Sequence, residues 1–208
     1  MGIRCLRCQA SLVAMALGSV LQERVGALAD KRLYELSSRG PFFRFLARNV
    51  KDLTCSEYFD DVPPGEFRGQ IQCQDVQRLT FRSESFHICT STEVFEHVPD
   101  DLQGFAEICR VLKPGGILLF TVPLHDMDRT RERARIENGE LVHQLPPEYH
   151  GDQIRGRGKV LSFRDYGRDI VERLLAAGFG RAEIIQTIDT TGAGFRMQVV
   201  IAFKGEQG

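Results

Sequence analysis

One stretch of the chain, residues 111–124, is almost free of polar side chains. Its sequence, VLKPGGILLFTVPL, runs from a helix-like segment through Lys-Pro-Gly-Gly into an apolar run. Pro114 cannot continue a helix, and Gly115 and Gly116 supply backbone angles that other residues avoid. An apolar run without polar alternation indicates a strand that is covered on both faces, as in a parallel sheet between two layers of helices.

Other segments show the patterns of amphipathic helices and of strands. Helices are clearest at 100–112 and 164–177, where apolar residues recur at helical spacing. In the first helix Asp100 or Asp101 is the expected cap, and Leu102 is expected on the buried stripe. The predicted strands are 32–37, 53–58, 71–76, 86–91, 116–122, 182–188 and 196–203.

This order of elements predicts a single α/β domain over residues 1–208. Strands that alternate with helices are typical of a mostly parallel sheet with helices on both faces. A short glycine-containing loop joins the last two strands, so we expect a C-terminal antiparallel hairpin. Residues 1–30 are expected to form a helical segment, and a long irregular insertion, 125–162, follows the fifth strand.

Composition and charge indicate an ordinary globular protein. Charged residues make up 26% of the chain and the net charge is −1, so nothing global favours nucleic acid or an acidic partner. The absence of any apolar run of about 18 residues predicts no transmembrane helix. The basic and apolar start of the chain resembles a signal peptide, but residues 22–24 (Gln-Glu-Arg) interrupt it. We therefore expect a helix packed on the domain and a cytoplasmic location.

The six cysteines agree with that location. Four of them, at 55, 73, 89 and 109, lie in predicted strands or helices, as buried reduced thiols do in cytosolic proteins. Cys5-x-x-Cys8 has half of a zinc-knuckle spacing, but no second CxxC or HxxxH completes four ligands. We favour a truncated or incidental pair over metal or redox use.

Acidic and hydroxyl side chains stand where the first four strands end. Glu35 and Glu57 close the first two strands, at about the spacing at which a carboxylate accepts hydrogen bonds from a ribose diol. Asp75 and Ser91 close the third and fourth. Ligands of open α/β sheets bind beyond the carboxyl ends of the strands, so these side chains are expected to meet there. One such carboxylate alone would be interpreted as a solvated loop residue, but three together fit a ligand with hydroxyl, amine and ammonium groups.

The segment from Tyr34 to Leu124 resembles the class I S-adenosylmethionine-dependent methyltransferases, especially the type 11 group. The resemblance rests on Asp75-x-x-x-Leu-Thr-Phe, on SFHICTSTEVFEHVPD and on EICRVLKPGGILLFTVPL. It implies a Rossmann-like class I methyltransferase fold, S-adenosylmethionine as cofactor, and methyl transfer to a small-molecule or other nucleophilic acceptor. The alternative is a non-catalytic binding module that keeps the fold.

The resemblance also assigns roles to the strand ends. Glu57 would hold the ribose hydroxyls, while Asp75 and the Val76 backbone would contact the adenine. Glu35 and Ser91 would face the methionine end. The cofactor-binding residues predicted in this way are Glu35, Ser37, Gly40, Glu57, Tyr58, Asp75, Val76 and Ser91.

The first loop departs from the family pattern. It is usually glycine-rich, which lets the backbone approach the cofactor, but here it reads Ser37-Ser38-Arg39-Gly40. The serines could donate to the cofactor carboxylate and Arg39 could pair with it. A loop that has lost the cofactor is the other interpretation, and it underlies the binding-module alternative.

Glu93, Glu96 and His97 stand at i, i+3 and i+4, where they can share one helix face. That geometry is able to hold a divalent metal, as a similar pattern does in some related methyltransferases. The same letters also occur in type 11 members without a metal, where they cap a helix and pin a loop. We favour this structural interpretation and predict no metal.

The insertion 125–162 lies where substrate-binding elements are expected. Its seven Lys/Arg residues balance seven Asp/Glu residues, so nucleic acid is not an expected partner. In Leu145-Pro-Pro-Glu-Tyr-His-Gly two prolines stiffen the approach to His150, the predicted catalytic base. The alternative, held equal, is that His150 only pins the loop through a backbone hydrogen bond. The expected partners are thus S-adenosylmethionine and a methyl acceptor, with no membrane.

Overall fold

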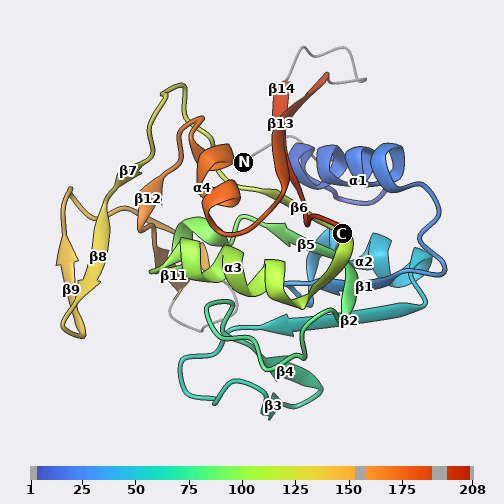
Figure 1. The fold of residues 1–208 in the computed structure, drawn as a ribbon, viewed down its shortest axis with the longest axis horizontal. Coiled ribbons are helices and arrows are strands. Elements are labelled where there is room, and N and C mark those ends of the chain that lie inside the picture. Colours follow the sequence, from blue (N-terminus) through green and yellow to red (C-terminus); the bar gives the residue numbers. More distant parts are fainter. Residues whose placement is uncertain (1–3, 153–157, 189–195, 207–208) are drawn as a thin grey trace.

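The computed structural model describes residues 4–152, 158–188 and 196–206. At its centre is an eight-stranded sheet with the order β13-β14-β6-β5-β1-β2-β4-β3 (Figure 1). Strands β4, β2, β1, β5 and β6 are parallel neighbours, whereas β14 runs antiparallel to both β6 and β13. The strands of this sheet are β1 Arg32–Glu35, β2 Asp52–Glu57, β3 Phe67–Arg68, β4 Ile71–Cys73, β5 Phe86–Thr92, β6 Leu112–Thr121, β13 Arg181–Ile188 and β14 Arg196–Phe203. The predicted fold, with its C-terminal antiparallel hairpin, is confirmed.

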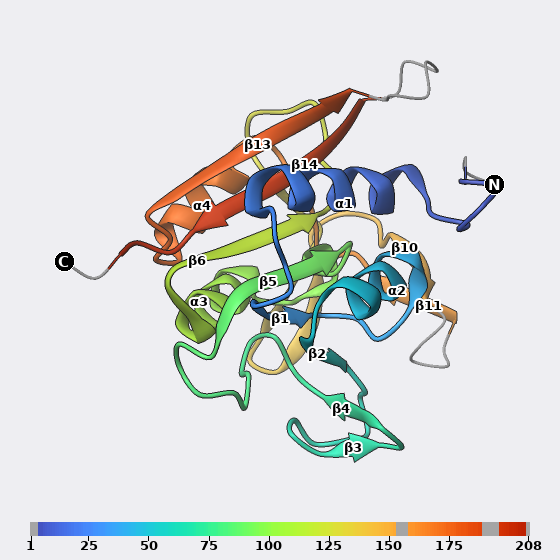
Figure 2. The same cartoon turned by 90° about the vertical axis from the view of Figure 1, so that its right-hand side faces the viewer.

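Four α-helices cover the two faces of this sheet within the described residues. Helices α1 (Leu12–Val25) and α2 (Gly40–Asn49) lie on one face, and α3 (Asp101–Val111) and α4 (Ile170–Ala176) lie on the other (Figure 2). Helix α1 falls within the N-terminal segment that was expected to be helical. In the described part of the chain no helix is long and apolar enough to cross a membrane.

Strand β6 is buried on both faces, as its apolar sequence predicts. Leu118 and Phe120 belong to the core under α3 and α4, whereas Leu119 belongs to the opposite core under α1 and α2. All three side chains are 0% exposed. The side chains of this strand therefore contribute to both hydrophobic cores.

The Lys-Pro-Gly-Gly segment works as an irregularity at the start of that strand. The register of the pairing between β5 and β6 shifts after Phe86. The Lys-Pro-Gly-Gly segment lies between the two paired positions on either side of this shift. Gly115 has φ +71°, and a Cβ on Gly116 would lie 2.7 Å from the Lys113 carbonyl oxygen. The two glycines are thus required by backbone geometry.

The predicted helix 164–177 begins too early. Residues Arg164–Asp165 form strand β12, and the helix itself covers only Ile170–Ala176 before Gly178, at φ +105°, ends it. Gly167 explains the delay, because a Cβ there would meet the backbone of residues 127–129 at under 3 Å. Tertiary contacts override the helical pattern here.

The other predicted helix is confirmed with one wrong detail. Asp100 is its cap, and its side chain accepts a hydrogen bond from Gln103 N at 3.0 Å. Leu102, however, is 41% exposed and does not lie on the buried face. Gly104 lies on the buried face instead, close to the side chains of Phe95 and Val76.

Two regions carry structure that the sequence patterns did not predict. Helix α2 was not expected, although it opens with Gly40 and a proline in its first turn. The described residues of the insertion, 125–152 and 158–162, carry short strands that were not expected in a segment predicted to be irregular. These strands are β7 Arg131–Glu132, β8 Ala134–Glu137, β9 Glu140–His143, β10 Tyr149–Asp152 and β11 Gly158–Leu161. Strand β12 (Arg164–Asp165), which follows the insertion, pairs with β7.

Replacing Gly116 with alanine should destabilise the protein by about 1–3 kcal/mol, because the new Cβ overlaps a backbone oxygen that cannot move freely. Gly18→Ala is the matched control. Gly18 lies inside α1 with open space around it, so alanine there should stabilise the protein by about 0.5–1 kcal/mol. Urea unfolding of both variants measures the difference. Equal midpoints for Gly116→Ala and the wild type would contradict this account of the turn.

Candidate functional site

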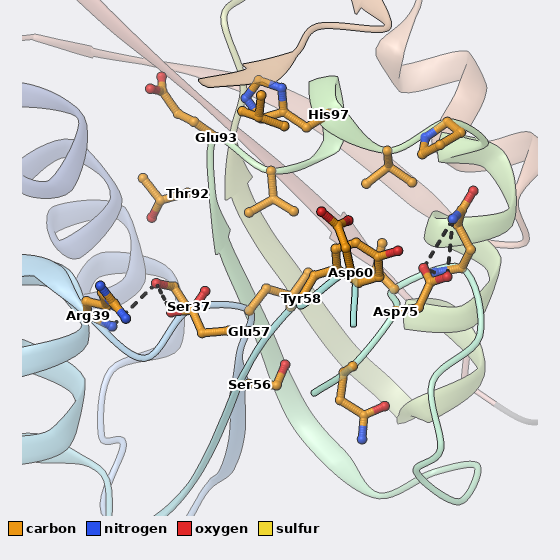
Figure 3. Close-up of a pocket in the computed structure, with 18 of the residues that line it drawn as sticks. Ser37, Arg39, Ser56, Glu57, Tyr58, Asp60, Asp75, Thr92, Glu93 and His97 are labelled. Atoms are coloured by element: carbon orange, nitrogen blue, oxygen red, sulfur yellow. Dashed lines mark hydrogen bonds between the residues drawn. The ribbon is translucent and has the colours of Figure 1, made fainter. Parts of the chain in front are cut away.

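A pocket of about 600 Å³ lies at the carboxyl ends of the parallel strands (Figure 3). That volume is typical of a site for a small ligand. Glu57 and Asp75 lie on one side of it, with Glu93 and His97 across from them. The insertion contributes a further part of the wall through Gly151 and Val160, and Phe163 follows directly after it.

Glu57, the last residue of β2, is held by the loop that follows β1. Its Oε1 accepts hydrogen bonds from Ser38 N at 2.7 Å, Ser38 Oγ at 2.8 Å and Ser37 Oγ at 3.3 Å. Within the described part of the chain no hydrogen bond reaches Oε2. The side chain is only 5% exposed, so this carboxylate is fixed in position with one oxygen left for a ligand.

Asp75 and Val76 form a second polar edge of the pocket. Asp75 Oδ1 accepts from Gln77 N at 2.9 Å and from Gln77 Nε2 at 3.1 Å. The Val76 amide, also in the pocket wall, donates to no group in the described residues. A backbone donor beside a fixed carboxylate can contact a planar heterocycle edge-on.

Two predicted cofactor residues, Glu35 and Ser91, do not line the pocket, and neither does the predicted base His150. Glu35 is 1% exposed and accepts a hydrogen bond from the Thr90 hydroxyl. Burial raises the pKa of Glu35 to about 8, so the carboxyl is protonated at neutral pH. Ser91 is 0% exposed, and its Oγ has no partner among the described residues. The other predicted cofactor residues, Ser37, Gly40, Glu57, Tyr58, Asp75 and Val76, all line the pocket.

Several pocket residues were missed in the sequence. Thr92 ends β5 one residue beyond Ser91, and Glu93 follows it at φ +52°. The strand-end rule would have found both if the predicted strand had been one residue longer. Asp60 and Gln77 also line the pocket, but they lie in irregular segments that carry no periodic signal.

His150 lies on β10, close to the pocket residue His97. Their ring centroids are 4.9 Å apart, and the rings are nearly perpendicular at 85°. His150 is therefore at the pocket end of the sheet, where its predicted role requires it to be. His97 Nδ1 bonds the Leu161 carbonyl at 2.8 Å, which fits the expectation that this motif pins a loop.

Glu96 does not fit that structural interpretation. It is 1% exposed, and both of its carboxylate oxygens lack hydrogen-bond partners within the described part of the chain. The cap of α3 is Asp100, so Glu96 does not cap that helix. Burial raises the pKa of Glu96 to about 8.

Arg164 holds the turn that carries Glu96 and His97. It is 3% exposed, and its guanidinium donates to the carbonyls of Phe95 at 3.0 Å, Val98 at 2.6 Å and Pro99 at 2.7 Å. Buried backbone carbonyls of an irregular turn need such donors. Strand β12, which carries Arg164 and precedes α4, is thereby joined to the short 3-10 helix η1 (Phe95–His97).

Four arginines of the insertion, between residues 129 and 135, are paired with carboxylates. Arg131 and Arg133 both contact Asp165, at 2.7 and 2.6 Å, and Arg129 contacts Glu172. Arg135 contacts Glu137. These pairs neutralise the stretch that is richest in arginine.

The fold is that of the class I S-adenosylmethionine-dependent methyltransferases. The solved 1,6-didemethyltoxoflavin-N1-methyltransferase of Burkholderia thailandensis, with bound S-adenosylhomocysteine, is 16% identical with a TM-score of 0.55. That match covers 94% of this chain and 79% of that chain. The cyclase SpnF is 16% identical with a TM-score of 0.57, over 99% of this chain and 87% of that chain. At this identity the likeness shows the fold alone.

The sequence match is more specific. Residues 37–120 match the type 11 family model described as a methyltransferase domain, which confirms the predicted resemblance. A stretch of 50 residues is 42% identical to the ubiquinone biosynthesis O-methyltransferase of Coxiella burnetii. This stretch is 24% of the chain, and it spans only 21% of the length of that enzyme.

Glu35 should make the stability of the ligand-free protein depend on pH. Its folded-state pKa of about 8 exceeds the ordinary value of 4.5, so its contribution is complete below about pH 4.5 and is lost as the pH rises through 8. Glu35→Gln keeps an acceptor for Thr90 and removes the titration. The variant should therefore gain stability relative to the wild type between pH 5 and 8, by at most about 1.4 kcal/mol per pH unit. Urea unfolding across that range measures the gain, and a constant difference would contradict the assignment.

Arg164→Met should destabilise the protein by about 3–5 kcal/mol, because the carbonyls of the η1 turn lose their buried donors. The control is Arg168→Met, whose ion pairs with Asp126 and Asp128 are exposed and should contribute under about 1 kcal/mol. Chemical denaturation compares the two variants. Similar losses for both would show that the carbonyl contacts of Arg164 are not what stabilises this turn.

Proposed function

We propose that this protein transfers a methyl group from S-adenosylmethionine to a small-molecule or other nucleophilic acceptor. The observation that carries the proposal is the fixed carboxylate of Glu57, with Oε2 left for a ligand, in a pocket at the carboxyl ends of the sheet. The methyltransferase family match spans most of the elements that build this pocket.

The pocket residues fit the cofactor group by group. Glu57 Oε2 would accept hydrogen bonds from the ribose hydroxyls, and Tyr58 beside it would supply a ring for the adenine. The Val76 amide and Asp75 would contact the adenine edge. Ser37 and Gly40 stand near the methionine end. Glu35 and Ser91 are proposed to act from outside the wall, by fixing the ends of β1 and β5.

The cofactor would supply an electrophilic methyl group on its sulfonium sulfur. The protein's contribution is to hold an acceptor in line with that methyl and to exclude water. Gly151, Val160 and Phe163 of the insertion region cover the side of the pocket that faces Glu93 and His97. We propose that the acceptor enters there, and that His150 can take a proton from an acceptor that must lose one.

The fold alone does not decide the reaction, since SpnF has the same fold and is a cyclase. The family match over residues 37–120 favours methyl transfer over a non-catalytic binding module. The proposal names only the chemical class of the acceptor, a small-molecule or other nucleophile, and not a particular molecule. A cytoplasmic location and the absence of nucleic-acid partners stay predictions from the sequence.

Calorimetric titration with S-adenosylhomocysteine tests the proposal, and Glu57→Gln is the informative variant. Glutamine keeps an oxygen for Ser38 and so preserves the loop, but it removes the charged acceptor for the ribose hydroxyls. Hydrogen bonds to charged groups contribute about 1.5–3 kcal/mol each, so binding should weaken at least about tenfold. Glu140→Gln, at an exposed site on β9, is the matched control and should bind as the wild type does.

Glu57→Ala is a poorer test, because it would also release the two serines of the loop. A melting temperature measured beside each titration separates lost contacts from lost folding. If the wild-type protein binds neither S-adenosylmethionine nor S-adenosylhomocysteine at millimolar concentration, the proposed function is wrong.

A further inference from the structure

Three potential metal ligands converge at the end of the pocket that the insertion covers. Glu96 and His97 come from η1, whereas His150 comes from β10, more than 50 residues later in the chain. One ligand atom from each lies within 4.8 Å of the others. No local sequence motif contains all three, so their meeting is a property of the fold.

Glu96 is the feature that requires an explanation. A carboxylate that is 1% exposed, with no hydrogen bond to either oxygen among the described residues, is costly unless something compensates it. Its nearest cationic candidates are the two histidines. His97 Nε2 lies 3.7 Å and His150 Nδ1 lies 3.9 Å from Glu96 Oε1. Both distances are too long for hydrogen bonds.

His97 is oriented as a metal ligand would be. Its Nδ1 lies 2.8 Å from the Leu161 carbonyl oxygen, which can only accept, so Nδ1 carries the hydrogen. In the neutral ring the lone pair is then on Nε2, the nitrogen that faces Glu96. A backbone carbonyl that fixes the tautomer in this way is the usual support of a metal-bound histidine.

The other nitrogen of His150 faces a second carboxylate at ion-pair distance. His150 Nε2 lies 3.6 Å from Glu148 Oε1, and Glu148 is held by Arg133 at 3.0 Å. Nδ1 therefore points to Glu96 while Nε2 points to a carboxylate. The pair of histidines and the buried carboxylate face one common point.

We propose that Glu96, His97 and His150 bind one divalent transition-metal cation. Ligand atoms that share such an ion at about 2.0–2.2 Å stand roughly 3–4 Å from one another, close to the separations from Glu96 Oε1. Two imidazoles with one carboxylate favour Zn²⁺, Mn²⁺ or Fe²⁺ over Mg²⁺ and Ca²⁺, which prefer oxygen ligands. His97 also lines the pocket, so the cation would be reached from it.

This proposal replaces the structural interpretation of the Glu93-Glu96-His97 motif, and it gives His150 a different role. As a ligand, His150 holds the cation through Nδ1 and ties the β10–β11 hairpin to η1. It would not then serve as a proton acceptor. Glu93 lies in the pocket wall but is not among the residues whose ligand atoms meet at this point.

Calorimetric titration of Zn²⁺ into the metal-free, tag-free chain tests the site. Because Cys5 and Cys8 could bind zinc on their own, the titration uses a Cys5→Ser, Cys8→Ser background. Glu96→Gln and His150→Gln remove one ligand each. His143→Gln removes an exposed histidine from β9 and is the matched control.

We expect one Zn²⁺ per chain in the background protein, with affinity reduced at least about tenfold in Glu96→Gln and His150→Gln and unchanged in His143→Gln. The melting temperature should rise with added Zn²⁺ only where the site is intact. His150 is partly exposed, so its replacement should leave the fold unchanged. Equal zinc binding by His150→Gln and the background, or no binding at millimolar Zn²⁺, would overturn the site.

The same proteins titrated with S-adenosylhomocysteine keep this proposal separate from the proposed function. Glu96 and His150 are absent from the wall on which Glu57 and Asp75 lie, so their variants should retain cofactor affinity. Lost zinc binding with intact cofactor binding supports the metal site. Zinc binding that survives in a protein without cofactor binding would leave the metal site standing and overturn methyl transfer.

Discussion

The far wall of the pocket depends on the hydrogen bonds that the buried guanidinium of Arg164 donates. Between β5 and α3 the chain makes an irregular turn that includes the short helix η1, and its buried carbonyls need donors. Arg164 donates to three of them, from a strand nearly 70 residues later in the chain. The same guanidinium also donates to Glu132 of β7 at 3.1 Å, so Arg164 makes the turn and the insertion one unit.

The site is therefore composite. The sheet and its loops supply a fixed carboxylate in Glu57 and a polar edge at Asp75, both at the carboxyl ends of parallel strands. The insertion adds Gly151 and Val160 to the wall and, beside it, His150 and the carbonyl that orients His97. The cofactor pocket and the proposed metal site thus share η1, and only the metal site takes a ligand, His150, from the insertion.

The sequence was sufficient where the signal is local. An apolar run marks β6, Asp100 marks a helix start, and carboxylates at strand ends mark the pocket, because in each case neighbouring residues set the structure. It was insufficient where distant contacts decide. The helix at 170 starts late because Gly167 packs against another segment, and the strands of the insertion have exposed, charged sequences without alternation. The convergence of Glu96 with His150 requires the folded chain.

The order of strands leaves the sheet with two unequal edges. On one side β3 has two residues, too few to template a further strand. On the other, β13 offers eight residues that pair only with β14 among the described strands. Arg181 lies over the Phe203 ring at 4.1 Å, and Glu183 contacts Arg24 of α1. This edge strand therefore carries charged side chains. Such residues discourage edge-to-edge association, and they protect the longest open strand from aggregation.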